Sequence, residues 1–260
     1  MDYEGVVVDL DGTVYRGERV LDGAAGAIER FRAMGLGVLF VTNNPTRSPA
    51  GYVERLAGLG IEADASAVLS AGAVTAEHLA DRHAGDEVFL IGSDGLRGMV
   101  TDAGVALTDE PDAADVLVTS HTYDFDYRDL TEGMWALDGA DAFYGTDPDL
   151  TYPDGDGREY PGSGAITRAV AGVAEREPDR VLGKPSSVMV NLVTERLGCP
   201  PQRCLVVGDG LDTDIAMGER AGMTTVLVRT GRHDDGDAAR ADVTPDHVVG
   251  SLGDVPDLLA

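Results

Sequence analysis

Residues 6–13 read VVVDLDGT, and they are the most informative segment of the chain. Three consecutive valines predict a short strand, and an unbroken apolar run is typical of a strand that helices cover on both faces. Asp9 and Asp11, with Gly12 and Thr13, follow where such a strand would end. Asp-Gly by itself is equally typical of a hairpin turn, so the remaining sequence has to distinguish a turn from a functional site.

Three further apolar runs end in polar residues in the same way. Residues 38–44 read VLFVTNN, residues 181–185 read VLGKP, and residues 205–214 read LVVGDGLDTD. Helical patterns such as residues 24–34 and 49–59 separate the strands, and this alternation predicts parallel strands joined by helical crossovers. Because the carboxyl ends of parallel strands lie along one edge of a sheet, we expect the polar residues to converge there.

The residue types at these strand ends suit a phosphate group bound beside a metal ion. Carboxylates that crowd together need a cation to stay ionised, and oxygen ligands alone favour a hard cation such as Mg²⁺. A hydroxyl, a lysine and backbone N–H groups can bind phosphate oxygens, and a carboxylate can attack phosphorus to form an aspartyl-phosphate. Lys184 is the single lysine among 20 basic residues, which favours a role that needs a compact point charge over a surface position.

The four segments resemble, in order, the four motifs of the haloacid dehalogenase-like hydrolases. Residues 145–149, GTDPD, and residues 161–166, PGSGAI, narrow the resemblance to the NagD and p-nitrophenylphosphatase branch, which carries a large α/β cap between its second and third motifs. The resemblance covers essentially the whole chain. It implies the α/β class: a doubly wound, parallel-sheet, Rossmann-like catalytic core of residues 1–74 and 182–260, with an inserted α/β cap of the C2 type at residues 75–181.

The resemblance also implies a role for each matching residue. Asp9 would be the nucleophile. Asp11 would protonate the leaving alcohol and then activate water, and its backbone carbonyl would contact the metal. Thr42 and the N–H of Asn43 would hold phosphoryl oxygens, and Lys184 would neutralise the nucleophile and the transferring group. The metal, Mg²⁺, would be held by Asp9, Asp11 and Asp209, and Asp214 would support it either directly or through water.

These roles imply Mg²⁺-dependent hydrolysis of small phosphomonoesters, such as sugar phosphates, phosphoglycolate or nucleoside monophosphates, through an aspartyl-phosphate. A phosphotransferase or mutase of the same superfamily would use the same residues, and a protein that binds a phosphorylated ligand without turnover is a third interpretation. Asp212 fits the first turn of a helix better than a metal site. Three departures from the pattern concern the substrate. Asp147 stands where the branch often has Asn, Gly210 stands where relatives often carry a larger residue, and residues 119–124, TSHTYD, differ from the usual cap sequence.

The composition restricts the partners. Acidic residues number 46 and basic residues 20, giving a formal net charge of −26 in 260 residues, so nucleic acid and anionic membranes are unfavourable partners. No apolar run approaches the ~18 residues of a membrane span and no signal segment is evident, so we expect a cytoplasmic protein; a homo-oligomer stays open. An acidic, lysine-poor chain also resembles proteins of halophilic microbes, and we expect it to lose stability at low salt.

Two local patterns add expectations about structure. Residues 146–164 are rich in Asp, Gly and Pro and predict a long loop. Trp135 lies at helical spacing from Leu130 and Met134, which predicts that its side chain is part of the core.

Overall fold

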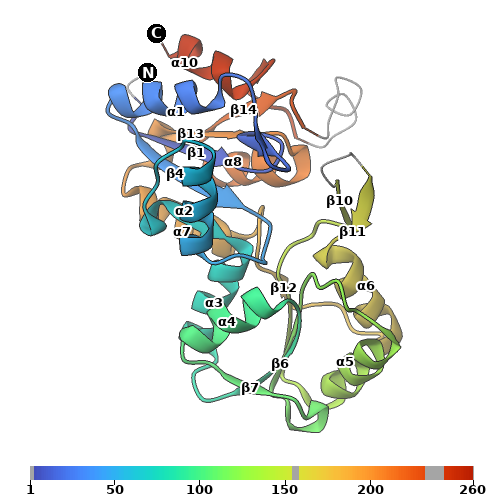
Figure 1. Ribbon diagram of the computed structural model, residues 1–260. Coiled ribbons are helices and arrows are strands. Elements are labelled where there is room, and N and C mark those ends of the chain that lie inside the picture. The colour runs from blue at the N-terminus through green and yellow to red at the C-terminus, as the bar shows by residue number, and fades with distance from the viewer. Residues whose placement is uncertain (1–2, 154–157, 232–242, 260) are drawn as a thin grey trace. The chain divides into compact units, whose positions relative to one another are not determined.

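The computed structural model describes residues 3–153, 158–231 and 243–259. The chain forms two compact units (Figure 1). The first unit comprises Met1–Thr42, Pro49–Leu69 and Met189–Ala260, and the second comprises Asn43–Ser48 and Ser70–Val188. Each unit has its own parallel sheet with helices, which confirms the predicted α/β class. Within the described ranges, no helix has the length and apolar character needed to cross a membrane.

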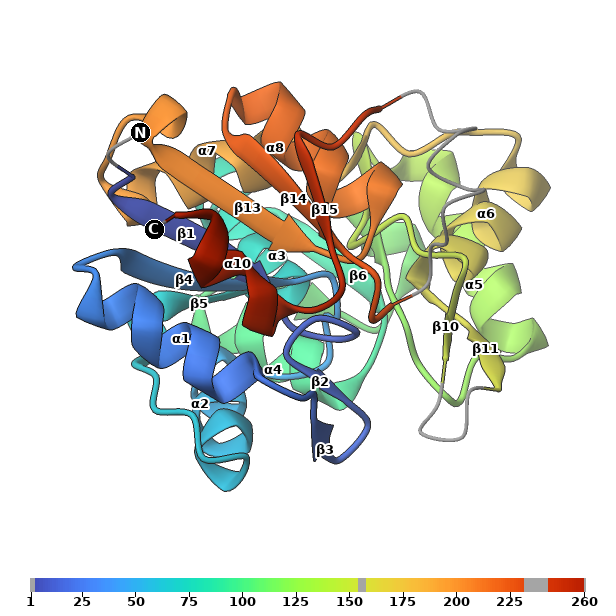
Figure 2. The ribbon, with the colours of Figure 1, turned by 90° about the horizontal axis from the view of Figure 1, so that it is seen from above.

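The first unit is built on a six-stranded sheet. In spatial order its strands are β15 (His247–Val249), β14 (Thr224–Val228), β13 (Cys204–Gly208), β1 (Gly5–Asp9), β4 (Gly37–Thr42) and β5 (Val68–Ser70). Its described helices are α1 (Ala24–Ala33), α2 (Pro49–Gly58), α7 (Ser187–Leu197), α8 (Ala216–Ala221) and α10 (Val255–Leu258), and a hairpin of β2 (Tyr15–Arg16) and β3 (Arg19–Val20) follows β1. Figure 2 shows α1 and α2 on one face of the sheet and α7 and α8 on the other.

The centre of this sheet is apolar on both faces. The three valines of β1 are at most 1% exposed, as expected for a strand between two helical layers. On one face, Ile28 and Phe31 of α1 and Tyr52 of α2 belong to the same buried cluster as β1. The parallel register places Val8 opposite Phe40 of β4 and opposite Val207 of β13, so these three strands end side by side. Three of the four sequence segments predicted to carry the chemistry lie at the ends of β1, β4 and β13.

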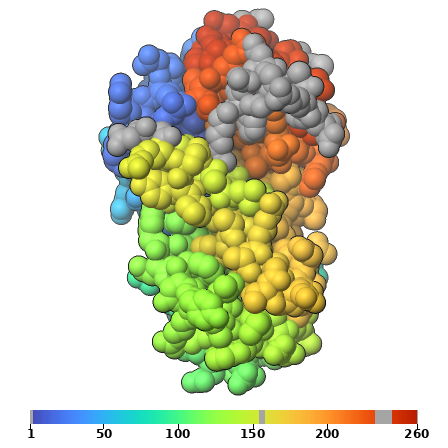
Figure 3. All heavy atoms as spheres, turned by 90° about the vertical axis from the view of Figure 1, so that its right-hand side faces the viewer, coloured from blue at the N-terminus to red at the C-terminus, as the bar shows by residue number. Residues whose placement is uncertain are grey.

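The second unit has a five-stranded parallel sheet of its own. In spatial order its strands are β12 (Arg180–Val181), β9 (Ala142–Gly145), β8 (Val116–Thr119), β6 (Glu87–Ile91) and β7 (Ala106–Thr108). Its helices within the described part are α3 (Ala71–Arg82), α4 (Asp94–Asp102), α5 (Tyr127–Gly139) and α6 (Ser163–Ala174). Figure 1 shows α3 and α4 on one face and α5 and α6 on the other, and the green to gold surface of Figure 3 is the part of the chain that carries α5 and α6.

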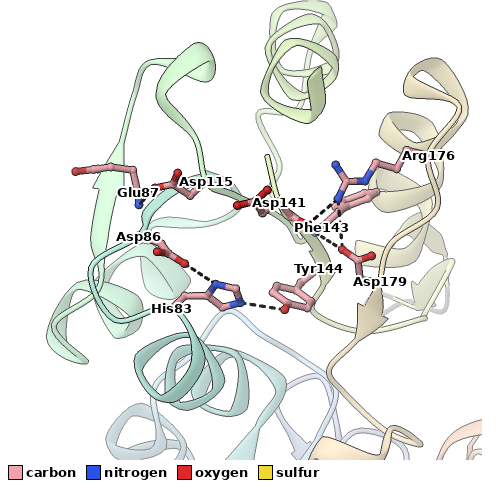
Figure 4. A network of polar contacts seen from close by, with 9 residues as sticks. All are labelled: His83, Asp86, Glu87, Asp115, Asp141, Phe143, Tyr144, Arg176 and Asp179. Carbon is pink, nitrogen blue, oxygen red and sulfur yellow. Dashed lines mark hydrogen bonds and ion pairs between the residues drawn. The ribbon is translucent and has the colours of Figure 1, made fainter. Parts of the chain in front are cut away.

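Polar contacts connect the segments that follow α3 and α6 to strand β9 (Figure 4). At the end of α3, the His83 ring contacts the carboxylate of Asp86 at 2.8 Å and the hydroxyl of Tyr144 at 3.0 Å. Beyond α6, Asp179 accepts a hydrogen bond from the N–H of Phe143 at 2.7 Å and lies 3.5 Å from the guanidinium of Arg176. The segments that follow α3 and α6, two helices on opposite faces of the sheet, are therefore both bonded to β9.

The structure differs from two local predictions. The segment predicted as a long loop contains an antiparallel hairpin of β10 (Thr151–Pro153) and β11 (Glu159–Pro161), whose three-residue strands are too short for an alternation to be recognised. The Trp135 side chain is 48% exposed and not part of the core, because it lies on the outer side of α5. The second unit extends beyond the predicted cap, residues 75–181, at both ends and also includes Asn43–Ser48.

Candidate active site

Three buried carboxylates meet in the first unit. Asp9 is the last residue of β1, Asp209 follows β13, and Asp214 lies in the turn Leu211–Ile215 that leads into α8. One oxygen from each carboxylate lies within 4.8 Å of the others, and the residues are 5%, 8% and 2% exposed, respectively. Carboxylates that are so close and so poorly hydrated need a cation to remain ionised together, and an all-oxygen donor set fits Mg²⁺.

Three glycines leave the space that two of these carboxylates, Asp209 and Asp214, occupy. A Cβ at Gly12 would lie 2.3 Å from Oδ2 of Asp209, and one at Gly231 would lie 1.6 Å from the same atom. A Cβ at Gly208 would lie 2.2 Å from Cγ of Asp214. The backbone thus makes room for these carboxylate groups on more than one side. This is a second, independent indication that the cluster is a functional site.

The turn before α8 holds Asp214 in place. Its Oδ2 accepts hydrogen bonds from the N–H of Gly210 at 3.1 Å and from Oγ1 of Thr213 at 3.3 Å. A Cβ at Gly210 would lie 2.0 Å from Oγ1 of Thr213. Thr213 therefore occupies the space that a side chain at position 210 would need. This explains why Gly210 stands where relatives often carry a larger residue. Asp212, predicted to be only a helix-start residue, is exposed.

The loop after β1 orients Asp9. Thr13 is fully buried, and its hydroxyl donates a hydrogen bond to Oδ2 of Asp9 at 3.0 Å. The loop closes through Gly12, whose N–H donates to the carbonyl of Tyr15 at 2.8 Å and whose φ of +89° few other residues adopt. On its other side, the hydroxyl of Thr230 donates to the carbonyl of Gly12 at 2.6 Å.

Asp11 lies outside the group of three carboxylates. It is exposed, and its Oδ2 accepts a hydrogen bond from the Tyr15 hydroxyl at 3.4 Å. Burial, with a smaller contribution from Asp11, raises the pKa of Tyr15 far above its ordinary value, so this phenol remains a donor. The Arg55 guanidinium lies 4.4 Å from the centre of the Tyr15 ring, a cation–π contact that helps to fix the ring.

The remaining predicted residues are divided between the units. Thr42, 2% exposed, ends β4 in the first unit. Asn43 and Lys184 belong to the second unit, where Oδ1 of Asn43 accepts a hydrogen bond from the N–H of Lys184 at 2.7 Å. Both are buried, at 7% and 2% exposure. Two residues far apart in the sequence are thus in direct contact.

Some residues of this region could not be assigned from the sequence. Thr13 belongs to the DLDGT segment, so the sequence marks it as a candidate site residue. The sequence does not reveal its hydrogen bond to Asp9. Tyr15 and Thr230 carry no comparable signal, since their roles depend on the way in which distant loops fold back on residues 11 and 12.

Two family models match this chain, and known proteins resemble it over most of its length. A haloacid dehalogenase-like hydrolase family matches residues 6–106, and a related HAD-hydrolase-like family matches residues 181–255. Sugar-phosphatase AraL of Bacillus subtilis is 35% identical over 254 residues, which cover 98% of this chain and 92% of that protein. Chronophin of Homo sapiens is 34% identical over 272 residues, covering 97% and 92% of the two chains.

A solved structure extends the likeness to three dimensions. The p-nitrophenyl phosphatase from Archaeoglobus fulgidus superposes with a TM-score of 0.92 at 31% identity, covering 99% of this chain and all of that one. Sequence and fold are therefore similar over practically the full length, as the four motifs predict. The chain is a hydrolase of the haloacid dehalogenase-like family.

Proposed function

We propose that this protein is a Mg²⁺-dependent phosphatase that hydrolyses small phosphomonoesters through an aspartyl-phosphate. The cluster of the buried carboxylates Asp9, Asp209 and Asp214 in the first unit carries the proposal. The relatives support the reaction class, because they are named as sugar phosphatases and p-nitrophenyl phosphatases.

Asp9 is the proposed nucleophile. One of its carboxylate oxygens attacks phosphorus, forming a P–O bond to the enzyme while the P–O bond to the leaving alcohol breaks. The hydrogen bond from Thr13 limits the rotation of this carboxylate, which favours an in-line approach. Asp11 donates a proton to the leaving oxygen, so the alcohol departs in its neutral form.

Hydrolysis of the phosphoenzyme reverses the proton transfer. Asp11, now ionised, takes a proton from water, and the water oxygen attacks phosphorus as the bond to Asp9 breaks. Inorganic phosphate leaves, and both carboxyl groups return to their starting states. The hydrogen bond between Tyr15 and Asp11 keeps the acid–base group near one orientation through both steps.

The other proposed residues bind the phosphoryl group. Thr42 and the N–H of Asn43 hold its oxygens, and the ammonium of Lys184 offsets its charge. The cation would be held by Asp209, Asp214, a carboxylate oxygen of Asp9 and the backbone carbonyl of Asp11. When bound, Mg²⁺ would supply electrostatic stabilisation of the phosphoryl oxygens and of the carboxylates around it.

The two units take different parts in this proposal. We assign the first unit as the catalytic core, because it holds the carboxylate cluster, and the second as the cap. A cap of this size favours small phosphorylated metabolites over phosphoprotein. Sugar phosphates are the class best supported, since relatives at 32–35% identity carry that name.

Phosphate release from p-nitrophenyl phosphate and a panel of sugar phosphates tests the function. We expect turnover with Mg²⁺ in molar KCl, loss of turnover with a chelator, and loss of turnover in Asp9→Asn, which keeps the shape of the side chain without its nucleophilic charge. Adding sugar acceptors separates hydrolysis from phosphoryl transfer. Tight binding of a phosphorylated ligand with no release from any substrate would overturn the phosphatase in favour of a binding protein.

A further inference from the structure

The side chain of Asn43 is positioned to hold the main chain of Lys184. Its Oδ1 accepts a hydrogen bond from the N–H of Lys184 at 2.7 Å, and its Nδ2 donates to the carbonyl of Lys184 at 3.3 Å. Nδ2 also donates to Oδ2 of Asp149 at 3.3 Å. One buried amide therefore brackets the backbone N–H and C=O of a single residue and is itself hydrogen-bonded to a carboxylate.

The segment before Lys184 is held from the opposite side. The N–H groups of Leu182 and Gly183 donate to the carbonyls of Gly145 and Thr146 at 2.9 and 2.7 Å. A Cβ at Gly183 would lie 2.7 Å from Oδ1 of Asn43 and 2.8 Å from the carbonyl oxygen of Thr146. Glycine is needed here because the chain passes between these two acceptors, and the approach of Asn43 to the Lys184 peptide depends on it.

Asp149 is fixed in its turn by a neighbouring buried carboxyl group. Its N–H donates to Oδ1 of Asp147 at 3.2 Å, and the hydroxyl of Thr146 donates to Oδ2 of Asp147 at 3.1 Å. Asp147 is 3% exposed. The contacts form a continuous series from the end of β9 through Asp147 and Asp149 to Asn43, and they end at Lys184.

We propose that the Asn43 side chain is a positioning residue for Lys184. This inference rests on the proposed function, in which Lys184 supplies the charge that offsets the phosphoryl group, and in which Asn43 itself contributes only its N–H. A lysine side chain has four rotatable bonds, so the position of its ammonium is defined only as well as the backbone from which it extends. Two hydrogen bonds from one buried amide hold that backbone, and a third ties the amide itself to Asp149.

A double-mutant cycle tests this coupling. Asn43→Ala is expected to lower kcat for p-nitrophenyl phosphate about 10- to 100-fold, because displacing a charged group by about 1 Å has effects of that size. In a Lys184→Met background the same substitution is expected to change kcat less than about twofold, since a residue that acts only through Lys184 has nothing further to lose. Thr46→Val is the control; it removes a side-chain hydrogen bond to Asn44 in the same loop and is expected to leave kcat unchanged.

A second measurement does not depend on the residual activity of the lysine variant. Asn43→Asp keeps an acceptor for the N–H of Lys184 but places a carboxylate against Asp149. Adding Asp149→Asn restores a donor–acceptor pair between the two positions, and we expect it to recover kcat at least about tenfold over Asn43→Asp alone. A structural role elsewhere would give no such recovery.

The outcomes separate this inference from the proposed function. Equal effects of Asn43→Ala with and without Lys184, or no recovery in the paired exchange, would overturn the positioning role while leaving the phosphatase intact. Full activity of Lys184→Met would instead remove Lys184 from the proposed mechanism.

Discussion

A single buried hydroxyl orients the proposed nucleophile. Thr13 donates to Oδ2 of Asp9, and valine has nearly the same shape without the donor. We expect Thr13→Val to lower kcat roughly tenfold with KM nearly unchanged, because orientation matters for the chemical step more than for binding. Thr75→Val is a matched control: the hydroxyl of this buried threonine donates to the carbonyl of Ala71 within α3, and its loss is expected to leave kcat unaffected. A normal kcat in Thr13→Val would show that Asp9 needs no such restraint.

The buried carboxyl group of Asp147 makes the stability of the folded protein depend on pH. Burial, with the charge of Asp149 as the next cause, raises the pKa of Asp147 from 3.8 to about 7. The folded protein therefore holds a proton that the unfolded chain releases between about pH 4 and pH 7, so the contribution of this group to stability is largest below about pH 4 and decreases as the pH rises to about 7.

Asp147→Asn removes this dependence, since the amide stays neutral. We expect the variant to gain stability relative to the parent as the pH rises from about 4 to about 7, with no further gain above about pH 7. Urea unfolding of both proteins in molar KCl across this range measures the difference. A difference that is the same at about pH 4 and at about pH 8 would contradict the titration.

The turn after β1 packs closely against the carboxylate of Asp209. Gly12 combines a φ of +89° with a Cβ position 2.3 Å from Asp209, whereas Gly60 has a φ of +79° and open space at its Cβ. Gly12→Ala is expected to raise the Mg²⁺ concentration for half-maximal activity at least about tenfold, because Asp209 must move. Gly60→Ala carries the backbone strain alone, and we expect it to lower the melting temperature without changing the Mg²⁺ dependence.

The helices and strands differ in how clearly the sequence predicts them. Strands β1 and β13 are apolar runs that end in polar residues, so both their type and their boundaries could be predicted. Helix α3 has a weaker pattern, because the alanine-rich segment Ala71–Arg82 places apolar side chains on most of its faces. The position of Trp135 could not be derived from spacing, since a helix at the surface has an outer side as well as a buried one.

At the scale of the molecule, the sequence predicts which residues carry chemistry better than how they are supported. Asp9, Thr42 and Asp209 stand at or just after the ends of adjacent strands, and the topology of a parallel sheet is enough to bring such positions to one edge. The bonds from Asn43 to Lys184 and Asp149 join residues more than 100 positions apart. Nothing in the local sequence records such contacts.

The net charge of −26 is a property of the whole chain, and it gives a prediction at that scale. Mutual repulsion is screened over ~3 Å in 1 M salt but over ~10 Å at 0.1 M. We expect the melting temperature, measured with a chelator present, to fall by about 5 °C or more between molar and 0.1 M KCl. An unchanged melting temperature would refute the halophile-like behaviour that the composition suggests.

The two units alternate along the sequence, and this limits which fragments of the chain can keep their internal contacts. Asn43–Ser48 belongs to the second unit although the first unit flanks it in sequence. Gly72 of α3 and Gly95 of α4 pack so closely on the carbonyls of Pro45 and Thr46 that a Cβ at either would lie 2.4 Å or less from oxygen. An excised fragment of residues 70–188 would lack Asn43–Ser48 and would lose these contacts of both helices, so an isolated second unit has to include that peptide as well.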